Sequence, residues 1–145
     1  MKAISLLERL GVTYTLLTEE QIDEHKRAWL HQFIPPEKQQ KAVESYCYSD
    51  YLWHAFSYKL LECLTGDEAR IALSGVQDNK AILLSNLDDS GAPIPAGFQI
   101  PEASLLTASS LDEIDDIVLT SVDFKWTYAK AHEPGLGPYF FYFDL

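Results

Sequence analysis

Histidines are the residues of this chain best suited to acid–base chemistry, and His54 has the most suggestive neighbours. Tyr51, His54, Tyr58 and Glu62 follow one another at spacings of three and four residues, which places them on one line along a helix. Such a line could form the rim of a pocket, with His54 as a general base or a hydrogen-bond donor. The alternative is a line that borders the core, where each phenol and imidazole bonds to backbone or water.

His132 and Glu133 form a second candidate group, at the point where a predicted strand meets a glycine-rich turn. Loops that are held by a rigid scaffold often carry binding and catalytic residues. Adjacent residues of a strand point to opposite faces, so these two side chains need not act together. The alternative is an ordinary polar turn.

A pocket between the middle helix and a C-terminal hairpin would combine the two groups. Two tryptophans would form its walls, and the histidines and the glutamate would supply its polar groups. The candidate ligand-binding residues are Trp53, His54, Tyr58, Trp126, His132 and Glu133.

Other common chemistries lack their sequence signatures. The GLG at 135–137 lacks the lysine and the following helix of a phosphate-binding loop, and no serine lies in a G-x-S-x-G pattern. Cys47 and Cys63 belong to no Cys-x-x-Cys pair, and no H-E-x-x-H pattern exists. We therefore expect no metal and no cofactor, and we expect the two cysteines to be buried free thiols.

Negative charge is concentrated in one stretch of the chain. The 145 residues include 11 basic and 22 acidic side chains, for a net charge of -11. Residues 81–124 contain no lysine or arginine and supply -8 of that total. Such a stretch can attract a basic partner, and the alternative is a solubilising surface loop. The candidate partner-binding residues are Asp112, Glu113, Asp115, Asp116 and Asp123.

The first half of the chain is predicted to be mostly helical. Thr18 with Gln21, and Thr65 with Glu68, have the spacing of capping boxes that begin helices. His25 lies on the apolar stripe of the helix that Thr18 begins, which is typical of a histidine at the edge of the core. The predicted helices span 2–10, 18–34, 37–46, 50–64 and 65–75, and a strand spans 12–17.

The second half is predicted to be mostly strands, over 79–84, 98–100, 117–131 and 138–143. Ser110 and Glu113 suggest one further capped helical turn. The alternation through 117–131, a short Gly/Pro turn and the aromatic PYFFYF run together predict a C-terminal β-hairpin. We therefore expect a single α+β domain over residues 1–145, with a helical N-terminal half packed on one face of an antiparallel sheet.

Two segments, YLWHAFSYKLLECLTGDEAR (51–70) and DFKWTYAKAHEPGLGPYFFY (123–142), resemble a family of small bacterial proteins known only as domain of unknown function number forty-two seventy-five. The resemblance supports the α+β fold and implies that the segments bearing His54 and His132 matter together. It implies no activity.

These observations favour a protein-binding module, of the kind that inhibits or confers immunity to a basic toxin or nuclease. The alternative is a small-ligand-binding protein, or an enzyme, that uses the pocket described above. The negative charge argues against a nucleic-acid or anionic-membrane partner.

We expect a cytoplasmic protein, because Glu8 and Arg9 interrupt the first apolar run and no apolar stretch is long enough to span a bilayer. The chain could be a monomer, or a homodimer if the PYFFYF strand lies at a sheet edge and pairs with a second copy.

Overall fold

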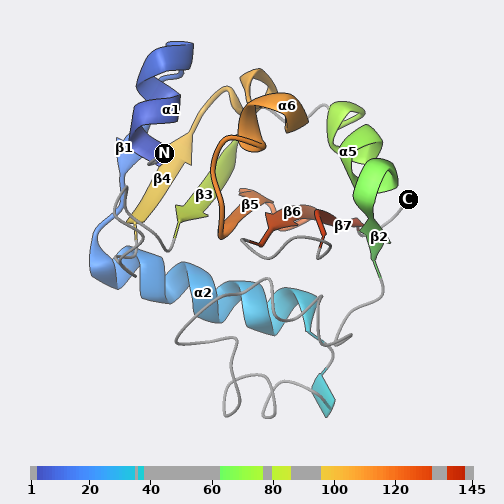
Figure 1. Ribbon diagram of the computed structural model, residues 1–145. Coiled ribbons are helices and arrows are strands. Elements are labelled where there is room, and N and C mark those ends of the chain that lie inside the picture. The colour runs from blue at the N-terminus through green and yellow to red at the C-terminus, as the bar shows by residue number, and fades with distance from the viewer. Residues whose placement is uncertain are drawn as a thin grey trace.

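A seven-stranded antiparallel sheet lies at the centre of the computed structural model, which describes residues 3–34, 36–37, 63–76, 80–85, 96–131 and 137–142 (Figure 1). The strands lie in the order β1-β4-β3-β5-β6-β7-β2, so the two shortest strands form the edges. Short edge strands offer few unpaired backbone groups to another chain. The strands are β1 (Thr15–Leu16), β2 (Leu64–Thr65), β3 (Ala81–Ser85), β4 (Ala96–Ile100), β5 (Ile117–Ser121), β6 (Trp126–Lys130) and β7 (Tyr139–Tyr142).

Helices cover both faces of this sheet. Among the described helices, α2 (Glu19–Phe33) covers one face (Figure 1). The other face carries α1 (Ala3–Leu10), α5 (Gly66–Ser74), the 3-10 helix η1 (Ala103–Leu105) and α6 (Ala108–Leu111). The predicted α+β class with an antiparallel sheet is confirmed, but the expectation that helices cover one face only is wrong. All five residues of β5 are buried, because side chains from both faces of this strand meet helices.

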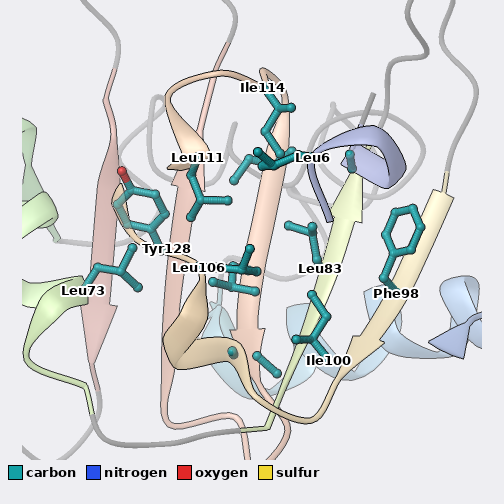
Figure 2. Close-up of a cluster of buried hydrophobic side chains, with 14 of the residues drawn as sticks. Leu6, Leu73, Leu83, Phe98, Ile100, Leu106, Leu111, Ile114 and Tyr128 are labelled. Carbon is teal, nitrogen blue, oxygen red and sulfur yellow. The ribbon is translucent and has the colours of Figure 1, made fainter. Parts of the chain in front are cut away.

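The larger core cluster fills the face that α1, α5 and α6 cover (Figure 2). Leu83 and Tyr128 project from the sheet, and Leu6, Leu73 and Leu111 meet them from the three helices. Each of these five side chains is buried. The cluster joins elements from both ends of the chain, so the N-terminal helix and the C-terminal strands share one apolar core.

The packing of α2 on the opposite face depends on apolar contacts and one buried hydrogen bond. Trp29 is fully buried, and its Nε1 donates to Thr127 Oγ1 on β6 at 2.9 Å. A neutral hydrogen bond of this kind contributes about 1 kcal/mol, and an unpaired buried indole N–H would cost more. Gly97 on β4 allows α2 this close approach, because a Cβ there would lie 2.8 Å from Ile22 Cγ1. The capping box predicted for Thr18 and Gln21 begins this helix as expected.

The predicted long strand over 117–131 is wrong, because a turn at residues 122–125 divides it into β5 and β6. Ser121 Oγ accepts hydrogen bonds from the backbone N–H groups of Lys125 and Trp126, at 2.8 and 3.2 Å. Phe124 adopts a left-handed backbone conformation with φ of 56°. An aromatic residue rarely occupies this region, so alternation of residue types gave no sign of the turn.

The strand pair β6–β7 confirms the predicted C-terminal hairpin. Two other local predictions are wrong. Thr65 precedes α5 but makes no side-chain capping bond, and Thr107, not Ser110, caps α6 by accepting from the Ser110 backbone N–H at 3.2 Å. The predicted helix over 50–64 lies outside the described residues except at its end, where Leu64 pairs with Phe140 as part of β2.

Candidate functional site

Only one of the predicted ligand-binding residues lies in the described part of the chain. Trp126 begins β6, is 1% exposed and stacks on Phe140 with ring centroids 6.1 Å apart. The other candidates lie outside the described residues, so the predicted pocket between the middle helix and the hairpin stays a prediction. They are Trp53, His54, Tyr58, His132 and Glu133.

Trp126 lines a different pocket, which lies between the end of α5 and the η1–α6 segment. Its volume is about 160 Å³. Ser74, Ser104 and Thr107 contribute hydroxyl side chains to the lining. The apolar lining residues are Leu73, Val76, Ala103, Leu106, Ala108 and Trp126.

The predicted partner-binding residues lie in and near the loop that connects α6 to β5, and their side chains contact cations of the same chain. Arg9 of α1 donates to both carboxylate oxygens of Glu113, with Nη1 2.8 Å from Oε1. Arg70 of α5 donates from Nη1 to Asp112 Oδ2 at 2.6 Å. These two ion pairs connect the loop to two different helices.

Lys130 of β6 makes the third and most buried of these connections. Its Nζ donates to the backbone carbonyl oxygens of Asp112 and Ile114, at 2.8 and 2.7 Å, and to Asp115 Oδ1 at 3.0 Å. The Lys130 side chain is only 14% exposed, whereas Asp115 is 52% exposed. All three ammonium protons therefore have an acceptor, and the loop backbone closes around the lysine. We call Asp112–Asp116 with Arg9, Arg70 and Lys130 the loop clamp.

The remaining two candidates differ from each other. Asp116 is 1% exposed and has a left-handed φ of 54°, so its side chain is not on the surface that a partner could reach. Asp123 lies in the β5–β6 turn with its Oδ2 3.8 Å from Lys125 Nζ, and both side chains are about half exposed. Such an exposed pair contributes little to stability.

The ion pairs also change the acidity of the loop. The hydrogen bond from Arg9 is the main cause that lowers the pKa of Glu113 below its ordinary value. Glu113 therefore keeps its charge to a lower pH than an isolated glutamate would. Its charge is offset by Arg9, so it adds less to the negative field around the molecule than the sequence alone suggests.

A second acidic surface lies on the first two turns of α2. Glu19, Glu20, Asp23 and Glu24 are all exposed, and within the described ranges none of them forms an ion pair. We call these four residues the acidic surface of α2. The sequence EEQIDE has a density of carboxylates similar to DEIDD at 112–116, so the signal was present. Glu19 and Glu20 also lie in the first turn of the helix, where acidic side chains stabilise the helix N-terminus.

His25 is a buried titratable group on the inner side of α2, and its neighbour Lys26 is also buried. It is 5% exposed, stacks on Phe124 with ring centroids 5.4 Å apart, and its Nε2 has no hydrogen-bond partner among the described residues. Burial lowers the pKa of His25 to about 4. The imidazole is therefore neutral near pH 7 and acts as part of the core, as its place on the apolar stripe predicted.

The described residues contain neither a candidate metal site nor a candidate membrane-spanning helix. No group of three or more His, Cys, Asp or Glu side chains there is arranged to hold a metal ion. No helix in the same ranges is long and apolar enough to cross a membrane.

Comparison with known proteins gives a family but no activity. The family described as "Domain of unknown function (DUF4275)" matches residues 14–140 of the chain. The match confirms the resemblance predicted from segments 51–70 and 123–142. No curated protein and no solved structure matches the chain.

The loop clamp predicts that Lys130→Met lowers stability by about 2 kcal/mol, because two carbonyl oxygens and a carboxylate lose a charged donor. Urea unfolding at neutral pH measures this change. The matched variant Lys125→Met removes the same charge at an exposed pair and should change stability by less than about 0.5 kcal/mol. Equal effects of the two substitutions would show that the clamp does not stabilise the fold.

The buried His25 predicts a loss of stability in mild acid. The unfolded chain takes up a proton on this residue near pH 6.5, whereas the folded protein does so only near pH 4, so the unfolded state binds more protons between these values. The free energy of unfolding should fall by about 3 kcal/mol as the pH is lowered through this window.

His25→Phe keeps an aromatic ring against Phe124 and should remove most of this fall, as measured by urea unfolding from about pH 7.5 to about pH 4. His31→Phe, at an exposed position of the same helix, should retain it. The prediction is wrong if both variants lose stability in acid as the unmodified protein does.

Proposed function

The chain belongs to the DUF4275 family, and from the charges on its surface we propose that it is a binding module for a basic protein, of an inhibitory or immunity-like kind. The observation that carries this proposal is the acidic surface of α2, where four exposed carboxylates lie within two helical turns. Long-range attraction between such a surface and a basic partner speeds association and selects against acidic partners.

The loop clamp supports the choice of α2 as the main contact. Arg9, Arg70 and Lys130 already offset the charges of Glu113, Asp112 and Asp115. A partner that approached this loop would have to compete with cations that the fold holds in place. Asp115 and Asp123, which are about half exposed, could add to the attraction from the edge of the loop and from the β5–β6 turn.

The proposal includes a bacterial source and a cytoplasmic location, with the chain acting as a monomer or homodimer. The excess of negative charge supports a protein partner over a nucleic acid or an anionic membrane. The predicted pocket at the middle helix remains the alternative, as a site for a small ligand or a reaction.

Co-expression with the products of adjacent genes tests the proposal. We expect one basic product to co-purify at low salt and to dissociate as salt rises from ~0.1 M to ~1 M, where the Debye length falls from about 10 to about 3 Å. Asp23→Asn with Glu24→Gln should slow association about fivefold, because both carboxylates are exposed and lie past the first helical turn.

The matched control makes the same charge change elsewhere. Glu37→Gln with Glu102→Gln also removes two exposed carboxylates and should leave the association rate nearly unchanged. An affinity that does not depend on salt would contradict a contact through α2. So would an equal decrease of the association rate in the two double variants. The absence of any basic partner among the adjacent gene products would argue against the binding module itself.

A further inference from the structure

The pocket beside Trp126 has walls that belong to the core of the protein. Leu73, Ala103, Leu106 and Trp126 are all at most 8% exposed and are members of the larger core cluster, in which Figure 2 labels Leu73 and Leu106. Backbone hydrogen bonds hold the pocket-lining turn of η1, where the Leu106 N–H donates to the Ala103 carbonyl oxygen at 2.9 Å. The pocket is therefore formed in the folded protein before any ligand binds.

The hydroxyl groups that line the pocket are engaged within the protein. Ser74 Oγ donates to the carbonyl oxygen of Ile71 at 2.6 Å, at the end of α5. Thr107 Oγ1 accepts from the Ser110 backbone N–H and lies 2.9 Å from Ser110 Oγ, at the start of α6. Ser74 Oγ can still accept a hydrogen bond, so the pocket suits a ligand with one hydroxyl group better than one with several polar groups.

The absence of charge in the described lining and the volume of the pocket further limit which ligands could bind there. None of the described residues that line the pocket is charged, so an ionised ligand would lose hydration without gaining an opposite charge. The volume of about 160 Å³ is close to that of an enclosed apolar cavity of about 150 Å³ that holds benzene, although this pocket is partly open to solvent. A molecule with one ring and no charge fits both limits.

We propose that the pocket between α5 and the η1–α6 segment binds a small uncharged ligand built around a single ring. Apolar contact with Leu73, Leu106 and Trp126 supplies the affinity. The small side chains of Ala103 and Ala108 leave the space that the ring occupies. The site is separate from the acidic surface of α2, which lies on the opposite face of the sheet.

A comparison of benzyl alcohol with benzylamine, which is cationic at neutral pH, tests the proposal on the complete chain. We expect benzyl alcohol to bind saturably and to shift the NMR signals of the Leu73 and Leu106 methyl groups and the Trp126 indole. Benzylamine should bind at least about tenfold more weakly, although the net charge of -11 attracts it. Equal binding of the two probes, or no saturable binding of benzyl alcohol, would overturn the proposal.

Filling the pocket provides the second arm of the experiment. Ala108→Leu adds atoms inside the pocket and should weaken benzyl alcohol binding at least about tenfold, whereas Ser109→Leu, at the exposed neighbouring position, should change it less than about twofold. If Ala108→Leu fails to fold, Ala108→Val makes the same test with a smaller side chain. Retained binding in the folded Ala108 variant would overturn the proposal. Neither result alters the case for a basic protein partner.

Discussion

Three cations that converge on one acidic loop hold the segment that enters β5, the central strand of the sheet. Arg9, Arg70 and Lys130 come from α1, α5 and β6, and all three donate to the loop that leads from α6 into β5. All five residues of β5 are buried, so the position of the loop that leads into this strand affects packing on both faces of the sheet. The loop clamp holds this loop on the face that α1, α5 and α6 cover. Lys130 matters most, since it is the least exposed of the three and satisfies two backbone carbonyl groups as well as a carboxylate.

This clamp changes what the net charge of -11 means for function. The carboxylates at 112–116 looked like a contact for a basic partner, yet three of them are held by the chain's own cations, and Asp116 is buried. The charge that remains without an ion pair in the described residues includes the first two turns of α2, on the opposite face of the sheet. The proposed partner contact therefore lies on α2, and the uncharged pocket beside Trp126 is a separate site of different chemistry.

Local patterns predicted the elements well where the signal lay in neighbouring residues. Thr18 and Gln21 predicted the start of α2, and the helix predicted over 2–10 ends as α1 does, just before Gly11, whose φ of 69° suits a glycine. Local patterns could not predict contacts between residues that are far apart in the sequence. Arg9 and Glu113 are 104 residues apart, and Trp29 and Thr127 are 98 residues apart. The turn at Phe124 was missed because an aromatic residue rarely adopts a positive φ, so the residue types gave no sign of the hydrogen bonds to the Ser121 side chain and carbonyl oxygen. The pocket at Trp126 was missed because three separate segments form it.

The carboxylates of the loop clamp are offset by cations of the same chain, whereas those on the acidic surface of α2 are available to a partner. An NMR titration tests this difference. Oligolysine is added to the ¹⁵N-labelled protein at low salt, and the changes in amide chemical shift show where this flexible polycation binds. The experiment does not require the natural partner to be known. We expect the amide shifts to concentrate at residues 19–24 and to disappear at high salt. Shifts that concentrate at 112–116, or that spread evenly over both faces of the sheet, would contradict this expectation.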